Sequence, residues 1–418
     1  MADLSNGIHP DKQPSARLTL RKIFGVFVSL TARALPVKRD AKTSKNSNGV
    51  LSESANLKMM KLTDLATMPV TINLRSFKLI DLEKATSNFI EVLGKGGSRN
   101  VYKGWVHEIS YDPSTPDIGL PVAVKRFSPE YEQHEKWQME IDLSKEYSHP
   151  NFVKLLGYCS EGQERLLVYE YMQNSDLDSH IFKPSNKTNE TVRKALRWEA
   201  RLNIMIGAAR CLAFFHTDQA KQVVICGDLK TSRILLDGKF NAKLSPSGLK
   251  RATQSKHYAN STACMVGTLG YAAPEYLKSN VMSLETDVYA FGVVLLELMT
   301  GIRASEMLHS EDSNSLGYHI EKQKRLLHYS NNLNLDPWLE DSLPEGTEHD
   351  IASLIAVCID DCPSKRPSML KVVERLERIS DSCKKYFMHK IRRIGHKKKR
   401  PMFWRTWNRF TLWITSTS

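Results

Sequence analysis

A glycine-rich segment, residues 94–101, has the composition of a phosphate-binding turn. Because glycine has no Cβ, the backbone N–H groups of such a turn can approach phosphate oxygens closely. Lys125 follows in the strand-like run VAVK, and Glu140 comes fifteen residues later in a segment of helical periodicity. A lysine placed in this way can hold the phosphates of a nucleotide while the glutamate pairs with it. The candidate nucleotide-binding residues are Leu93, Gly94, Gly96, Gly97, Val101, Lys125 and Glu140.

Further charged residues follow downstream in an order that suits catalysis and structural support. In ICGDLKTSRILLD, Asp228 and Lys230 precede a short apolar strand, residues 234–236. A carboxylate there could accept the proton of a substrate hydroxyl, so Asp228 and Lys230 are the candidate catalytic residues. The structural candidates are Glu275, in the run APEY, Asp287 and Arg366. No one of these patterns is decisive, but their order along residues 94–366 is that of the protein-kinase motifs.

A small sheet followed by helices must position these residues. Five strands and one helix are predicted within about 85 residues, which indicates a sheet-based lobe. The strand-like runs are 89–106, which contains two strands, 120–127, 152–159 and 164–172, and the helix is 135–147. Three later segments predict a mostly helical lobe: 198–216, with one apolar face, 288–301, apolar nearly all round and ended by Gly301, and 369–379. The fold class is therefore α+β.

From about Phe77 to Ile379 the chain resembles the kinase domain of plant receptor-like cytoplasmic kinases that carry an N-terminal arm. The resemblance rests on FKLIDLEKATSNF, VYKGW, HPNFVKLLGYC, KTSRILLD, GYAAPEY and DVYAFGVVLLELMTG. It implies a bilobal protein-kinase fold over 76–383, with an N-lobe at about 89–172 and a C-lobe at about 173–380. It also implies Ser/Thr phosphorylation with ATP and magnesium, in signalling at the cytoplasmic face of the plasma membrane, with receptor kinases or immune receptors as partners.

The chain departs from the family pattern at five positions in or near the site. Arg233 stands where the family has Asn, and Pro246 and Ser247 stand where it has Asp and Phe. That Asn and that Asp are the magnesium ligands of kinases, and Mg²⁺ needs oxygen ligands that proline does not offer. Gly227 replaces the Arg before the catalytic Asp, and Arg99 replaces the third glycine of the loop. We therefore expect no magnesium, leave ATP binding open, and expect phosphoryl transfer to be absent or very weak.

The retained charged groups each allow two interpretations. Asp228 could act as a base, but we favour a hydrogen-bonding role within its loop. A base contributes only about 10²–10⁴-fold and needs a positioned substrate. Lys125 and Glu140 could bind nucleotide or form a structural ion pair between sheet and helix, and the sequence does not favour either.

The loop 253–268 resembles an activation segment, with Ser261, Thr262 and Thr268 as candidate phosphorylation sites. The alternative is a solvated loop whose hydroxyls carry no function. The seven cysteines show no metal-binding spacing, which indicates free thiols in a reducing compartment. Two of them, Cys226 and Cys264, lie near the predicted site, and we interpret them as buried apolar residues.

The net charge of +13 is carried by the two ends of the chain. Residues 384–409 contain eleven Lys or Arg and no acid, and residues 1–56 contain nine Lys or Arg against four acids. The segment 384–418 is predicted to be a basic tail interleaved with aromatic residues, and 1–75 a largely disordered arm. Each cation near an anionic leaflet contributes about 1 kcal/mol, and basic runs also suit nuclear import. Because three of the chain's seven Trp lie in this tail, a membrane surface bound through 384–413 is preferred to nuclear import or to a solvated tail. Nucleic acid is not expected as a partner.

Three functional hypotheses remain open from the sequence. The first is a cytoplasmic pseudokinase, peripheral at the plasma membrane, that serves as a scaffold, decoy or regulator in receptor-linked signalling, with defence as one setting. The second is an active Ser/Thr kinase that uses Asp228, Lys125 and Lys230. The third is a membrane-surface or nuclear adaptor that works through the basic tail.

Overall fold

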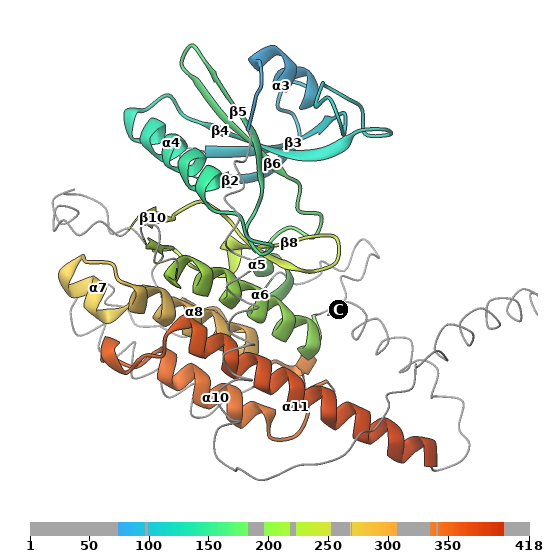
Figure 1. The fold of residues 1–418 in the computed structure, drawn as a ribbon, viewed down its shortest axis with the longest axis vertical. Coiled ribbons are helices and arrows are strands. Elements are labelled where there is room, and N and C mark those ends of the chain that lie inside the picture. Colours follow the sequence, from blue (N-terminus) through green and yellow to red (C-terminus); the bar gives the residue numbers. More distant parts are fainter. Residues whose placement is uncertain are drawn as a thin grey trace, which may run out of the picture. The chain divides into compact units, whose positions relative to one another are not determined.

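The structure is a computed structural model that describes residues 74–96, 99–182, 196–217, 223–251, 268, 270–306, 335–339 and 342–396. These residues belong to one unit of the chain, Pro69–Ser418. They form a sheet lobe followed by a helical lobe (Figure 1). The predicted α+β arrangement is confirmed.

The sheet lobe is built on six strands in the order β1-β5-β6-β4-β3-β2. The strands are β1 (Arg75–Ser76), β2 (Val92–Gly96), β3 (Arg99–Val106), β4 (Leu120–Phe127), β5 (Leu155–Glu161) and β6 (Glu164–Glu170). Five of them were expected, and β1, which pairs in parallel with β5, was not. At this pairing a Cβ on Gly157 would lie 2.3 Å from the carbonyl oxygen of Arg75, so the added strand depends on a glycine in β5.

The alternation of side chains along β4 decides which face Lys125 occupies. Val122 and Val124 pack on one face, in a cluster that includes Leu82 of helix α3 (Leu79–Ala85). Phe127 packs on the other face with Trp137 of helix α4 (Tyr131–Glu146). Lys125 has the same parity as Phe127, so the strand directs it toward α4.

The helical lobe surrounds two buried helices, α6 (Trp198–Thr217) and α8 (Leu284–Thr300). Every residue of α8 from Thr286 to Thr300 is buried, which is why its sequence is apolar nearly all round. Gly301 ends this helix, as predicted, and it adopts φ 68° in the left-handed region. The other helices are α5 (Leu177–Ile181), α7 (Pro274–Ser279), α10 (Thr347–Cys358) and α11 (Met369–His396), with 3₁₀ turns η5 (Pro337–Leu339) and η6 (Pro363–Lys365).

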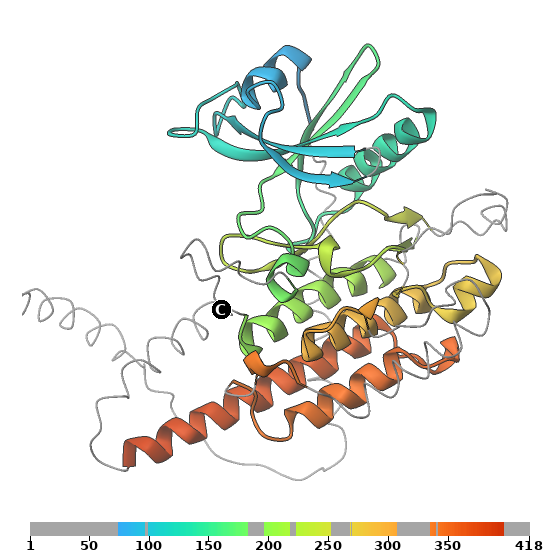
Figure 2. The same cartoon turned by 180° about the vertical axis from the view of Figure 1, so that it is seen from behind.

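Short strands form the part of the helical lobe that faces the sheet lobe (Figure 2). The hairpin of β8 (Ile234–Leu236) and β9 (Ala242–Leu244) follows the 3₁₀ turn η2 (Thr231–Arg233). A second pair joins β7 (Val224–Ile225) to β10 (Lys250–Arg251). The predicted catalytic residues lie between β7 and β8, so both strand pairs position them.

The last helix, α11, is longer than expected. The sequence predicted a helix over 369–379 and a tail from 384, whereas α11 continues to His396 and its end projects past the neighbouring helices in Figures 1 and 2. Trp198 of α6 donates a hydrogen bond to Cys383 at 3.4 Å, which fixes α11 against α6. The first part of the predicted tail therefore continues a packed helix. Within the described ranges, no helix is long and apolar enough to span a membrane.

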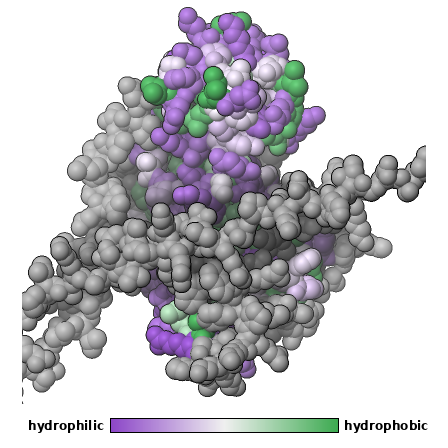
Figure 3. Space-filling model, turned by 90° about the vertical axis from the view of Figure 1, so that its right-hand side faces the viewer, coloured by the Kyte–Doolittle hydropathy of each residue, from purple (hydrophilic) through white to green (hydrophobic). Residues whose placement is uncertain are grey.

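One face of the sheet lobe is mainly hydrophilic (Figure 3). On the face seen in Figure 3, hydrophobic residues are scattered among hydrophilic ones and form no continuous patch within the part that the structure describes. Single exposed apolar residues are normal on soluble domains. This face therefore gives no sign of an apolar docking site.

Candidate active site

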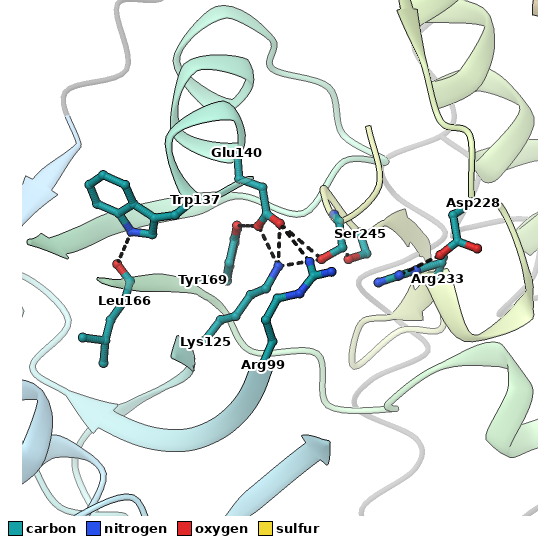
Figure 4. Close-up of polar contacts among 10 residues, drawn as sticks. Arg99, Lys125, Trp137, Glu140, Leu166, Tyr169, Asp228, Arg233 and Ser245 are labelled. Carbon is teal, nitrogen blue, oxygen red and sulfur yellow. Dashed lines mark hydrogen bonds and ion pairs between the residues drawn. The ribbon is translucent and has the colours of Figure 1, made fainter. Parts of the chain in front are cut away.

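Lys125 and Glu140 form a buried ion pair at the centre of the site (Figure 4). The Lys125 Nζ donates to Glu140 Oε1 at 2.6 Å and to Oε2 at 2.8 Å. Tyr169 of β6 donates to the same carboxylate at 2.6 Å, and Trp137 fixes α4 to the sheet through the carbonyl of Leu166 at 3.1 Å. Strand β4 and helix α4 thus bring the two predicted residues together.

Ser247 completes the hydrogen bonding of Lys125. The Lys125 Nζ donates to Ser247 Oγ at 2.6 Å, across 122 positions of sequence. An ammonium group has three N–H donors, and the two oxygens of Glu140 and this hydroxyl take all of them. The lysine is therefore fully satisfied within the protein.

Burial governs the ionisation of this cluster. It lowers the pKa of Lys125 to about 8, although the negative charge of Glu140 acts in the opposite direction. The positive charges of Arg99 and Arg233 lower the pKa of this lysine further. Burial and the Glu140 carboxylate raise the pKa of Tyr169 well above its ordinary value, so its hydroxyl remains a donor. The ion pair therefore lies close enough to the positive charges of Arg99 and Arg233 to be influenced by them.

The glycine-rich hairpin of β2 and β3 is open at Gly94. Strands β2 and β3 place Leu93 and Val101 on the two sides of the turn, with an irregular register between Val92 and Gly94. A Cβ on Gly94 would meet nothing within 4 Å. Of the other candidate glycines, Gly96 is the last residue of β2 and Gly97 lies outside the described residues. The hairpin keeps the openness that a phosphate-binding turn requires.

Arg99, at the position of the third loop glycine, extends toward the ion pair. Its Nη1 lies 3.7 Å from Glu140 Oε1, and its guanidinium carbon lies 6.0 Å from the centre of the Phe127 ring. The replacement of a loop glycine by Arg99 predicts a side chain that crowds or repositions the loop over the phosphates. In the structure the charge of Arg99 lies next to Glu140 and Lys125.

Asp228 is held by three neighbouring side chains. Arg233 donates from Nη2 to Asp228 Oδ2 at 2.8 Å, and Thr268 donates to Oδ1 at 3.1 Å. Lys230 donates to Thr268 Oγ1 at 2.6 Å and lies 3.7 Å from Asp228 Oδ2. Both carboxylate oxygens are therefore engaged, and the hydroxyl of Thr268, a candidate phosphorylation site, is part of the same network.

The two expected magnesium positions present no carboxylate or amide oxygen. Pro246 is buried in the turn between β9 and β10 and has no side-chain oxygen. Arg233 presents a guanidinium group, and its carbonyl accepts a hydrogen bond from Ser245 N at 2.9 Å, which ties η2 to that turn. Across the described ranges, no group of three or more His, Cys, Asp and Glu is placed to hold a metal ion.

Asp287 supports the loop that carries Asp228. It accepts hydrogen bonds from Cys226 N at 2.7 Å and Gly227 N at 2.9 Å, and His216 Nε2 lies 3.0 Å from its Oδ2. Gly227 adopts φ 66°, a conformation that side chains with a Cβ rarely take. The Cys226 side chain is buried and its pKa is raised by burial, consistent with an apolar role.

Glu275 and Arg366 form the second predicted structural contact. Arg366 donates to Glu275 Oε1 and Oε2, each at 2.7 Å, and also to the carbonyls of Glu285 and Asp360. The guanidinium also lies 5.0 Å from the centre of the Tyr289 ring. This contact joins α7 to the segments around α8 and α11.

Several functional contacts could not be read from the sequence. Tyr169 and Ser247 complete the Lys125 cluster. Tyr169 lies in an apolar strand and belongs to no motif, and Ser247 is notable in the sequence only because the family has Phe at its position. Arg233 was expected only to repel a metal, and its ion pair with Asp228 was not anticipated. The remaining site candidates, Ser261, Thr262 and Cys264, lie outside the described residues, as do most of the arm and the end of the tail.

The fold and this constellation define a protein-kinase domain. The family "Protein tyrosine and serine/threonine kinase" matches residues 87–376, so the chain belongs to that family. The relative "Probable serine/threonine-protein kinase PBL11" of Arabidopsis thaliana is 40% identical over 314 residues, which cover 73% of this chain and 78% of the relative.

Two further relatives show the same level of similarity. "Serine/threonine-protein kinase BIK1" of Arabidopsis thaliana is 39% identical over 329 residues, covering 77% of this chain and 79% of that protein. "Receptor-like cytoplasmic kinase 176" of Oryza sativa subsp. japonica is 37% identical over 317 residues, covering 74% and 77%. The predicted likeness to receptor-like cytoplasmic kinases is therefore matched by the name of a relative.

Proposed function

We propose that this chain is a kinase-fold signalling protein in which phosphoryl transfer is lost or strongly reduced. It would act by binding other signalling proteins as a scaffold, decoy or regulator. The names of the relatives support a place in kinase signalling, and the family resemblance makes receptor kinases the expected class of partner.

The observation that carries this proposal is the 2.8 Å ion pair between Arg233 and Asp228. It places a cation where kinases place a magnesium ligand, and it engages the carboxylate that would accept the substrate proton. Pro246 removes the other ligand. Because Mg²⁺ binds oxygen ligands in near-octahedral geometry, this donor set does not fit it. Without the metal, the charge that develops on a transferring phosphoryl group loses its main stabilisation.

An active Ser/Thr kinase is the second candidate function. The buried Lys125–Glu140 pair favours it, because phosphoryl transfer in kinases needs such a pair. The Lys230–Thr268–Asp228 contacts also keep a cation beside the carboxylate that would act as base. For this function Arg233 would have to release Asp228, and another group would have to bind the metal.

Autophosphorylation of the purified full chain with ATP and magnesium separates these two functions. We expect the wild type to match Asp228→Asn, a variant without the carboxylate base. Strong phosphorylation in the wild type that disappears in Asp228→Asn would refute the proposed loss of activity. A thermal shift with ATP that requires magnesium would also favour the active kinase.

We further propose that the basic C-terminal segment brings the protein to an anionic membrane surface, with nuclear import as the alternative. The last turns of α11 support this proposal: Lys385, Lys390 and Arg392 are exposed, and Tyr386 and Met388 are each 40% exposed. A deletion should begin at residue 397, because Cys383 is buried against α6 and α11 continues to His396. This deletion removes six of the eleven Lys and Arg of residues 384–409 and leaves the exposed residues of α11 in place, so weaker sedimentation with phosphatidylserine vesicles is expected. Unchanged binding would contradict the proposal.

A further inference from the structure

Two arginines beside the ion pair carry donors without a protein partner among the described residues. The Nε of Arg233 is buried and unpaired, since this side chain bonds Asp228 through Nη2 only. Arg99 lies 3.7 Å from Glu140, which is an ion-pair distance and too long for a hydrogen bond. Buried donors are nearly always satisfied in proteins, so an unpaired one requires an explanation. An oxygen of a bound ligand would supply it.

The site carries more positive than negative charge. The cations are Arg99, Lys125, Lys230 and Arg233, and the carboxylates are Glu140 and Asp228. Figure 4 shows Arg233 between Asp228 and the cluster around Lys125. Arg99 and Arg233 both act on the charge of Lys125, so these groups form one electrostatic field. The excess of two positive charges favours a polyanion.

We propose that this site binds the polyphosphate chain of a nucleotide without a divalent cation, with the Arg233 guanidinium neutralising phosphate charge in place of Mg²⁺. The proposal rests on the proposed loss of the metal ligands. A guanidinium presents several donors in a plane, which suits phosphate oxygens, and the space beside Gly94 leaves the turn accessible. A magnesium-bound nucleotide carries two fewer negative charges, so this site should prefer the metal-free form.

Calorimetric titration of the full chain with ATP, in excess EDTA and in millimolar MgCl₂, tests the proposal. We expect binding in EDTA and weaker binding with MgCl₂. Arg233→Gln should weaken the metal-free affinity about tenfold, the contribution of one charge-assisted hydrogen bond. The matched control is Arg210→Gln, which removes an exposed arginine paired with Glu377 and should leave the affinity unchanged. Thermal unfolding of each variant without ligand confirms that it is folded.

Two further ligands identify what the site recognises. Inorganic tripolyphosphate should bind in EDTA. Adenosine, which has no phosphate, should show no affinity that depends on Arg233. ATP binding only in magnesium, no ATP binding under either condition, or equal affinities of Arg233→Gln and Arg210→Gln would each overturn the proposal. EDTA prevents metal-dependent turnover, so these titrations are independent of the autophosphorylation result. Activity in magnesium would refute the proposed function while leaving the metal-free affinity as a separate measurement.

Discussion

Replacing Lys125 by Met removes one partner of an ion pair whose side chains are 7% and 5% exposed. The variant leaves the Glu140 carboxylate buried, with the Tyr169 hydroxyl at 2.6 Å, the Ser247 hydroxyl at 3.5 Å and Arg99 at 3.7 Å as its remaining partners. Breaking a buried pair in this way costs about 3–5 kcal/mol. Because three partners remain, we expect the lower end, about 3 kcal/mol. For a domain of this size, that change lowers the melting temperature by roughly 5 °C.

The neighbouring residue on the same strand provides a matched control. Arg126 pairs with Glu164 at 2.5 Å, but these side chains are 38% and 29% exposed, so Arg126→Met should cost at most about 1 kcal/mol. Thermal unfolding followed by circular dichroism compares the two variants. Equal melting temperatures would refute the assignment of a large cost to burial.

A double variant tests where the cost arises. Burial already lowers the pKa of Lys125 to about 8, which means that the charged lysine itself is destabilised in the folded protein. The loss in Lys125→Met should therefore come from the carboxylate left behind. Lys125→Met with Glu140→Gln removes both charges and keeps an oxygen that can accept from Tyr169, and it should recover at least half of the loss. A double variant that is no more stable than Lys125→Met would contradict this reasoning.

Three further predictions concern the helical lobe. Burial raises the pKa of Glu297 from 4.5 to about 7, so its contribution to stability is fully present below about pH 4.5 and is lost as the pH rises through about 7. Glu297→Gln should flatten that dependence in melts from about pH 5 to 8, and parallel curves would contradict it. Arg366→Lys should lower the free energy of unfolding in urea by about 2 kcal/mol, because lysine cannot reproduce the paired 2.7 Å bonds to Glu275; an unchanged midpoint would refute this. Gly227→Ala should cost about 1–2 kcal/mol by the same measurement because φ is 66°, and a neutral effect would show that the loop relaxes.

Part of the fold could be predicted because its signals are local. The β-branched run 120–127 predicted β4, and the alternation of side chains along this strand places Lys125 on the face of Phe127, which packs on α4. The all-apolar segment before Gly301 predicted a buried helix and its end. Strand β1 could not be predicted in this way, because two residues are too short to show a period and its position depends on the close approach of Gly157.

The candidate site also has a part that local patterns predicted and a part that depends on contacts between side chains. The order of the glycine turn, Lys125, Glu140 and Asp228 could be read in sequence, because each residue stands in a short pattern that has its own chemistry. The partner of Asp228 could not be predicted, because side-chain direction in η2 decides whether Arg233 faces solvent, the nucleotide or the carboxylate.

The sequence by itself determined the class of this protein and the side chains at the two positions where a magnesium ligand was expected, since proline at 246 and arginine at 233 offer no carboxylate or amide oxygen. Only the tertiary structure decided which contacts are made around them. It brings Ser247 to 2.6 Å from Lys125 across 122 positions, and it places the Arg233 guanidinium 2.8 Å from Asp228. The interaction energy between two charges depends on their distance and burial, and neither can be read from the amino-acid sequence.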